Sequence, residues 1–151
     1  MVNPKKLDNN VIQEGVILSD ALRFGDDRGD FVNLGFEHSF KRSYIISNNH
    51  KGIVRAFHGH KQENKLFFVP KGAFKFILMN METLEYKEYS LLASVPKLLY
   101  VPKGYYNGFV SLTDDALLVT FSTSDIESSK KDDFRLPYDF IGKEVWEVNN
   151  R

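Results

Sequence analysis

The chain has 151 residues, a size that suits one domain with a buried core, and its 20 basic residues balance 20 acidic ones. This balance gives no overall field that would attract nucleic acid or an anionic membrane, so any anionic ligand must be held by a local cluster of Lys and Arg. Cysteine is absent, which excludes disulfides, thiolate nucleophiles and Cys-based zinc sites. No apolar run approaches the ~20 residues of a transmembrane helix, and the N-terminus has no apolar stretch of the signal-peptide type. We therefore expect a soluble cytoplasmic protein.

Short apolar segments, rich in Val, Ile, Phe and Tyr and separated by Gly, Pro, Asn, Asp or Lys, follow one another along the chain. They are FVNLGF (31–36), SYIIS (43–47), GIVRAF (52–57), NKLFFV (64–69), AFKFILMN (73–80), LEYKEYS (84–90), KLLYV (97–101), GFVSL (108–112) and ALLVTFST (116–123). Segments of this length and composition predict an all-β sandwich or barrel. Short helical turns are expected only in the flanks, at residues 17–22 and 124–134.

The sequence VPKG occurs twice, at 69–72 and at 101–104. Proline removes a donor from the ladder and fixes φ, while glycine permits positive φ, so each copy predicts a corner between two strands. The repeat favours a jelly-roll barrel with two pseudo-equivalent halves, although two similar turns could also arise by chance. No linker is visible, and we expect a single domain over residues 1–151 with a core at about 26–125. The C-terminal segment, which contains Trp146, is expected to pack on this barrel.

Two histidines in RAFHGHK, His58 and His60, have a spacing that suggests a metal site. With Gly52 and Gly72 they resemble the first motif of the cupins, in which a glutamate ligand precedes the second glycine by seven positions. Lys65 stands at that position, and Asn107 replaces the histidine of the second motif in PKGYYN. An ammonium group in the first coordination shell repels a divalent cation, so we expect no metal and no cofactor.

The chain also resembles the cupin enzymes of nucleotide-linked 4-keto-6-deoxy sugars. The segments DDRGDF (26–31), KGIVRAFH (51–58), ENKLFFVPKG (63–72) and VPKGYYNGFVSLTDDA (101–116) are similar, in order and spacing, to motifs of the dTDP-4-dehydrorhamnose 3,5-epimerases. The resemblance covers roughly residues 26–125. It implies a nucleotide diphosphate sugar as substrate and a reaction without metal, in which a base removes a proton next to the C4 ketone.

The resemblance also assigns roles. His58 lies at the position of the family's catalytic histidine, and a neutral imidazole titrates near the working pH. Lys65 is the candidate for holding the enolate oxygen. Arg55 and Arg28 match substrate-binding arginines, whose planar fork suits a diphosphate. In a regular strand His58 and Arg55 would face opposite sides, so both can line a pocket only if a bulge intervenes.

Several positions depart from the epimerase pattern. Its acid tyrosine falls at about Thr120 or Phe121, and the C-terminal aspartate that partners its histidine has no evident counterpart. We consider Tyr44, Tyr105 and Tyr106 as replacement acids, and Tyr44, Tyr105 and Asn107 as substrate-binding residues.

The segments RAFHGHK and KRSYIISN are closer to the dTDP-sugar 3,4-ketoisomerases, in which two histidines move the proton. That similarity makes His60 a second catalytic candidate. We expect an epimerase-like isomerase of bacterial polysaccharide biosynthesis. The alternatives are a 3,4-ketoisomerase and a non-catalytic cupin that binds a nucleotide sugar. Homodimerisation through sheet edges is implied by the resemblance and would shield exposed strands.

Overall fold

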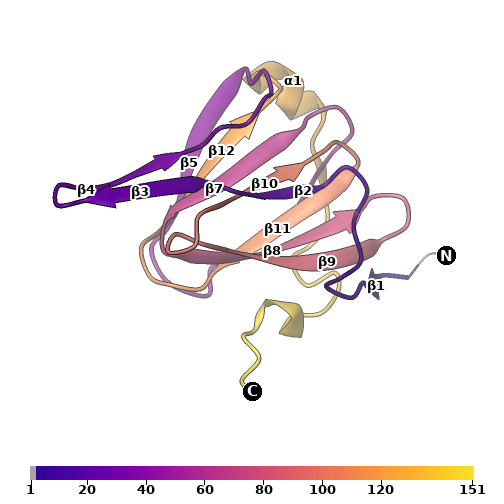
Figure 1. Ribbon diagram of the computed structural model, residues 1–151. Coiled ribbons are helices and arrows are strands. Elements are labelled where there is room, and N and C mark those ends of the chain that lie inside the picture. The colour runs from indigo at the N-terminus through magenta and orange to yellow at the C-terminus, as the bar shows by residue number, and fades with distance from the viewer. Residues whose placement is uncertain (1–2) are drawn as a thin grey trace.

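The computed structural model describes residues 3–151 and has the all-β architecture expected from the sequence (Figure 1). Two sheets face each other, and a hairpin projects from one end of them. The first sheet has the strand order β1-β9-β8-β11-β6-β13. Its strands are β1 (Lys5–Lys6), β6 (Val54–His60), β8 (Ala73–Asn80), β9 (Glu85–Leu92), β11 (Tyr105–Ser111) and β13 (Phe134–Arg135).

The second sheet has the order β2-β10-β7-β12-β5. Its strands are β2 (Ile17–Asp20), β5 (Arg42–Asn48), β7 (Lys65–Lys71), β10 (Lys97–Val101) and β12 (Ala116–Ser122), and the projecting hairpin consists of β3 (Leu22–Asp26) and β4 (Gly29–Asn33). Helix α1 (Ile126–Lys131) is the short helix expected in the second flank, followed near the C-terminus by one 3-10 turn (Glu144–Trp146). The expected helical turn at 17–22 is wrong, because Ile17–Asp20 pairs as an edge strand with β10. No helix among residues 3–151 has the length and hydropathy needed to cross a membrane.

Both VPKG segments form the corners predicted from the sequence. Gly72 and Gly104 have φ angles of 77° and 93°, which glycine adopts without a steric penalty. The first corner leads from β7 to β8 and the second from β10 to β11, so each carries the chain from the second sheet to the first. This shared function in the fold explains why the same four residues occur twice.

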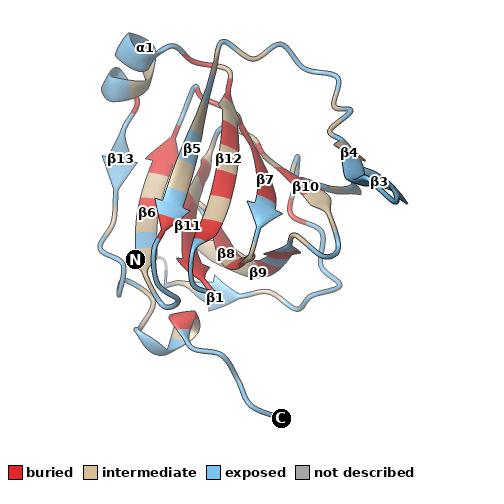
Figure 2. Cartoon of the chain, turned by 90° about the vertical axis from the view of Figure 1, so that its left-hand side faces the viewer, coloured by how far each residue is buried: buried red, intermediate tan, exposed pale blue. Residues whose placement is uncertain are grey.

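Aromatic side chains fill the space between the sheets. Phe67 from the second sheet lies 5.0 Å from Phe76 of the first, measured between ring centroids, and Phe76 lies 5.2 Å from Phe109. All three are almost completely buried. Figure 2 shows that buried residues concentrate on the strands at the middle of the sheets, whereas α1, β13 and the hairpin are exposed. Burying aromatic rings of this size supplies much of the hydrophobic stabilisation of the barrel.

A second cluster forms behind β6. Trp146 packs on Phe57 with 5.4 Å between ring centroids, and its Nε1 donates a hydrogen bond of 2.8 Å to the carbonyl oxygen of Tyr138. Phe57 is completely buried and Trp146 is 7% exposed. The C-terminal segment is therefore fastened to the outer face of the first sheet, directly behind the strand that carries both candidate histidines.

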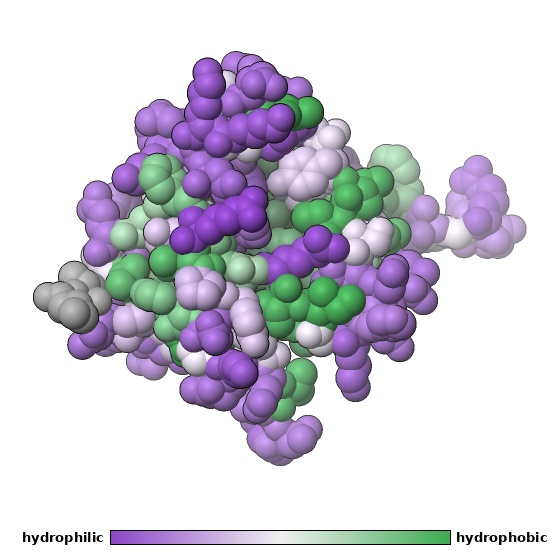
Figure 3. Space-filling view, turned by 180° about the vertical axis from the view of Figure 1, so that it is seen from behind, coloured by the Kyte–Doolittle hydropathy of each residue, from purple (hydrophilic) through white to green (hydrophobic). Residues whose placement is uncertain are grey.

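The β3–β4 hairpin projects away from the barrel (Figures 1 and 3). Phe24 and Phe31 are directly paired across it, and they are 59% and 65% exposed. In Figure 3 the hairpin extends beyond the right-hand edge of the molecule, with hydrophilic side chains at its tip. Exposed aromatic rings on a projecting hairpin are typical of a surface that another chain covers.

Candidate active site

The candidate site lies where edge strand β5 of one sheet faces β6 and β13 of the other, on the side turned to the viewer in Figure 2. Two adjoining cavities occur there. The inner pocket, of about 410 Å³, reaches the aromatic core at Phe67 and Phe109. The outer pocket, of about 490 Å³, is bordered by α1. The residues common to both are Tyr44, His58, Lys65 and Arg135.

A bulge in β6 brings Arg55 and His58 to the same pocket, as the sequence analysis required. His58 pairs with Asn107 of β11, whereas Arg55 pairs with Phe109, so three steps along β6 match only two along β11. The extra residue reverses the alternation of side chains, and both Arg55 and His58 line the inner pocket. Gly108, opposite the bulge, leaves the space it needs, because a Cβ there would come within 2.5 Å of the Cβ of Ala56.

His58 is the imidazole that both pockets share. Burial lowers its pKa, and the positive charges of Arg135 and Lys65 lower it further, while Asp133 opposes them. The ring is therefore neutral at pH 7 and able to accept a proton. Across the ladder, Nδ2 of Asn107 donates to the carbonyl oxygen of His58 at 3.2 Å, which fixes the backbone beneath the ring.

His60 lies deeper and is held by the chain segment after α1. Its Nδ1 is 2.6 Å from the carbonyl oxygen of Asp132. Burial and the charge of Lys65 lower the pKa of His60, whereas Asp132 and Glu63 act in the opposite direction. His60 lines the outer pocket only, so the two histidines share that pocket and only His58 also reaches the inner one.

Lys65 is largely buried in an otherwise apolar strand, where its ammonium group borders both pockets. Its Nζ lies 3.4 Å from Oε2 of Glu63, whose side chain is completely buried. The other oxygen of this carboxylate lies 3.4 Å from Nη2 of Arg42. Glu63 thus partly neutralises the largely buried Lys65 and the half-buried Arg42.

Two arginines border the inner pocket. Arg55 is oriented by hydrogen bonds from its Nε to Oδ1 of Asn48, at 2.8 Å, and from its Nη2 to the carbonyl oxygen of Ser47. Arg135 pairs with Asp133, with 3.1 Å between Nε and Oδ2. Both guanidinium groups remain accessible enough to bind an anion bidentately.

Tyr44 reaches the site from the second sheet, opposite the strand that carries His58. The guanidinium group of Arg42 lies over its ring, 5.1 Å from the centroid. Tyr44 lines both pockets, and its hydroxyl is a hydrogen-bond donor. Thr120 and Phe121, where the epimerase tyrosine was expected to fall, are absent from the lining of both pockets.

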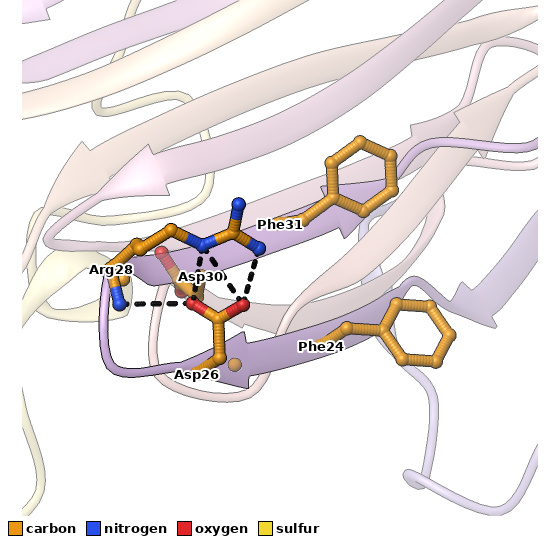
Figure 4. A pocket seen from close by; sticks show the side chains of 7 residues that line it. Phe24, Asp26, Arg28, Asp30 and Phe31 are labelled. Carbon is orange, nitrogen blue, oxygen red and sulfur yellow. Dashed lines mark hydrogen bonds and ion pairs between the residues drawn. The ribbon is translucent and has the colours of Figure 1, made fainter.

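Three of the expected residues are not brought to this site, and one of them, Tyr106, packs in the cluster of Phe57 and Trp146. Tyr105 is buried in the core, and its hydroxyl donates to the carbonyl oxygen of Glu14 at a separate cleft. Arg28 lies near the tip of the hairpin, where its Nε and Nη2 bind the carboxylate of Asp26 (Figure 4). Arg28 lines a shallow surface pocket together with the exposed Phe24 and Phe31. The side chains that the structure brings together are Tyr44, Arg55, His58, His60, Lys65 and Asn107.

Sequence reasoning missed Glu63 and the segment after α1. The run SSKKDD (128–133) has the composition of a solvated turn, but its fifth residue is buried. Asp132 is 6% exposed, and its carboxylate accepts hydrogen bonds from the backbone amides of Lys61, Gln62 and Glu63. The two residues of β13 place Arg135 opposite His58. The only signal for Glu63 in the sequence was an acidic residue between His60 and Lys65, which resembles an ordinary polar turn.

The assembled site combines a neutral imidazole, a buried ammonium group and two arginines in a partly apolar pocket. Such a set can remove a weakly acidic proton, stabilise the oxyanion that forms and bind a phosphate group. Within residues 3–151, no three His, Cys, Asp or Glu side chains come together as a set of metal ligands.

Known proteins resemble the chain in sequence and in structure. It is 28% identical over 138 residues to the spore coat polysaccharide biosynthesis protein SpsL of Bacillus subtilis, covering 83% of this chain and 90% of that protein. The dTDP-4-dehydrorhamnose 3,5-epimerase of Bacillus anthracis superimposes with a TM-score of 0.74 at 25% identity, over 83% of this chain and 80% of that one. A dTDP sugar isomerase from Desulfovibrio desulfuricans, 22% identical, has the same fold, with a TM-score of 0.73 over 85% and 88% of the two chains.

These similarities confirm the jelly-roll cupin fold expected from the sequence. The model of the family described as "WxcM-like, C-terminal" (FdtA) matches residues 15–143, which is most of the chain. The chain belongs to the WxcM-like C-terminal (FdtA) family.

Proposed function

We propose that the protein is an isomerase of a nucleotide-linked 4-keto-6-deoxy sugar that moves a proton next to the ketone without a metal. The observation that carries this proposal is the presence of the neutral His58 and the ammonium group of Lys65 on one pocket. The C4 ketone acidifies the neighbouring C–H bonds, so an imidazole of moderate basicity suffices when a cation stabilises the enolate oxygen. The Bacillus anthracis epimerase, which shares the fold, binds TDP and pyrophosphate.

Each side chain has a distinct role in this proposal. His58 is the base, and Lys65 binds the oxygen on which negative charge develops. Arg55, supported by Arg135, binds the diphosphate, and Asn107 orients the backbone of His58. No cofactor is required, because both half-reactions are proton transfers. We place the reaction in the cytoplasm, as expected from the sequence.

We favour the epimerase version, because Tyr44 stands on the wall opposite His58 and can return a proton to the other face of the sugar carbon. A 3,4-ketoisomerase is the second candidate. It is favoured by the absence of Thr120 and Phe121 from the pocket walls and by the pair of histidines on one strand. In that reaction the ketone moves from C4 to C3.

Solvent exchange separates these versions. The protein is incubated in D2O with dTDP- and GDP-linked 4-keto-6-deoxyhexoses, and deuterium at each carbon is followed by NMR. Uptake at C5 supports an epimerase and excludes simple ketoisomerase chemistry. Deuterium at C4 of a product whose ketone lies at C3 supports the ketoisomerase. Binding without exchange at any carbon would contradict both and leave a non-catalytic sugar-binding cupin.

The base assignment is tested with matched variants. His58→Asn should abolish exchange, because an amide cannot accept the proton. His50→Asn is the control, since His50 is exposed in the loop after β5 and lines neither pocket. Full exchange activity in His58→Asn would overturn the role of His58.

We also propose that the protein acts as a homodimer whose hairpin carries Arg28 toward the pocket of the second copy. Arg28 lies outside the pockets of its own chain, and the hairpin exposes Phe24 and Phe31. In a homodimer, Arg28 could bind the substrate held in the pocket of the second copy, although it lies outside the pocket of its own chain.

Mixing two inactive variants tests the arrangement. Arg28→Ala lacks the hairpin cation, and His58→Asn lacks the base. After mixing and subunit exchange, a hybrid dimer contains one pocket with both native residues, so up to about half of the activity of that dimer should return. Activity that stays at the level of the separate variants would contradict a shared pocket.

A further inference from the structure

Glu63 is a buried carboxylate beside the site with no assigned function. It lies in the turn between β6 and β7, and its side chain has no exposed surface. Three basic groups surround it: Arg42 at 3.4 Å from Oε1, and Lys65 and His60 at 3.4 Å and 3.5 Å from Oε2. Acidic side chains are rarely buried completely unless such partners hold them.

The carbonyl oxygen of Asp132 determines which nitrogen of His60 carries the proton. A carbonyl oxygen only accepts hydrogen bonds, so Nδ1, at 2.6 Å, must donate. Neutral His60 therefore has its lone pair on Nε2, which faces Oε2 of Glu63. Within residues 3–151, neither Nε2 nor Oε2 has a hydrogen-bond partner of good geometry.

A lone pair on Nε2 and a carboxylate oxygen repel each other, so their closeness is favourable only when a proton lies between them. The same oxygen, Oε2, also faces the ammonium group of Lys65. One carboxylate oxygen thus joins the ring of His60 to the cation that borders both pockets.

We propose that Glu63 is a positioning residue that holds Lys65 toward the substrate and joins it to Nε2 of His60 in one proton-sharing unit. The identity of the substrate rests on the proposed function, whereas the proton-sharing unit does not. His60, with both nitrogens directed at protein groups, serves this unit and leaves His58 as the imidazole that touches the sugar.

The unit also supplies a candidate for the general acid, which the sequence did not identify. When Lys65 passes a proton to the sugar oxygen, the proton shared between Nε2 of His60 and Oε2 of Glu63 moves to Lys65, which leaves Glu63 ionised and His60 neutral. The imidazole keeps its proton on Nδ1. Because His58 has taken one proton from the sugar carbon, the total number of protons in the site is unchanged.

The first test uses NMR on the free protein and needs no substrate. The ring resonances of His60 are identified by their absence in His60→Gln and titrated in wild type and in Glu63→Gln. We expect a proton on Nδ1 in neutral His60 and a transition at lower pH in Glu63→Gln, because the variant loses a negative charge that raises the pKa of His60. Lys65, Asp132, Asp133 and His58 also act on this ring and remain in both proteins.

The second test separates positioning from binding. Glu63→Gln should lower kcat about 10- to 100-fold with KM within about twofold, because it misplaces Lys65 without removing a phosphate contact. Glu37→Gln, at an exposed loop position, is the matched control and should change neither parameter.

Two results would overturn the proposal: a proton on Nε2 of neutral His60, or a titration of His60 that is unchanged in Glu63→Gln. If Glu63→Gln does not fold, a titration of Glu63 in the wild-type protein tests the proposal instead. The carboxyl carbon of Glu63 must then change its chemical shift over the pH range in which His60 titrates, and an independent shift would overturn the unit. Absence of isomerase activity in wild type would contradict the proposed function and leave the NMR result standing.

Discussion

The ring of His60 and the main chain of Asp132 meet across 72 residues of sequence, with Nδ1 2.6 Å from the carbonyl oxygen. The carboxylate of the same aspartate accepts hydrogen bonds from three successive amides, those of residues 61–63. One residue therefore fixes both the imidazole and the turn that carries Glu63.

Asp132→Asn should destabilise the protein in a pH-dependent way. Burial raises the pKa of this carboxyl, but hydrogen bonds from the three amides outweigh it, so the net pKa lies below 3.8. The stabilisation is therefore complete above pH 3.8 and is lost as the pH falls below it. At pH 7 the variant should lose about 1–2 kcal/mol, since its amide oxygen replaces only part of these hydrogen bonds.

Thermal unfolding from pH 7 to pH 2.5 checks this expectation. The difference in Tm between wild type and Asp132→Asn should shrink below pH 3.8. Asp27→Asn in the exposed hairpin turn is the control and should follow wild type throughout. A constant difference down to pH 2.5 would contradict the role of the charge.

Arg135→Gln should raise the pKa of His58. Burial is the largest cause that lowers this pKa, and the charge of Arg135 is the next. Removing that charge also frees Asp133, which acts in the same upward direction. In the proposed mechanism the base is neutral His58, so the acidic limb of the kcat/KM profile should move to higher pH. Arg151→Gln at the exposed C-terminus should leave the profile in place, and an unmoved limb in Arg135→Gln would refute the expected coupling.

Gly108→Ala should disturb the bulge that aligns the site. A Cβ at this position would lie 2.5 Å from Ala56 and 2.9 Å from the ring of Trp146. Overpacking of this kind costs about 1–3 kcal/mol. Gly25→Ala is the control, because its nearest contact, the carbonyl oxygen of Gly29, lies 3.7 Å away. Denaturant unfolding measures both variants, and equal stability of the two would show that the bulge tolerates a side chain there.

Phe31→Ser should dissociate the proposed homodimer into monomers. Phe31 and its cross-strand partner Phe24 are exposed in the single chain, and covering both rings supplies hydrophobic stabilisation to a dimer. Light scattering coupled to size-exclusion chromatography gives the mass directly. Ile12→Ser, which removes a side chain 86% exposed outside the hairpin, is the control and should remain dimeric. A dimer of unchanged stability in Phe31→Ser would place the interface elsewhere.

Local patterns in the sequence predicted much of this fold. Apolar runs identified the strands of the barrel, and the two VPKG segments identified the corners at Gly72 and Gly104. The register of the first cupin motif found His58 and Lys65, and the need for a bulge followed from the spacing between Arg55 and His58. These features depend on residues that lie close together in the sequence, so they can be predicted from the sequence alone.

Other features depend on contacts between distant segments. β13 has only two residues, Phe134 and Arg135, which are too few to show any periodicity, yet its pairing with β6 brings Arg135 into the pocket. The local sequence around Glu63 does not show that it is buried, because its burial depends on a contact with Arg42 from another strand. The position of Arg28 could not be predicted either, since the direction in which a hairpin projects is not encoded in its own residues.

The short strand β13 also has a consequence for stability under stress. It is an edge with one neighbour and only two paired residues, whereas β8 and β11 lie between two partners each. Amide protons at 134–136 should therefore exchange with solvent through local opening that leaves the aromatic core intact. Because this segment carries Asp133 and Arg135, mild denaturant should abolish catalysis before the barrel unfolds, so loss of activity and loss of structure should follow separate curves.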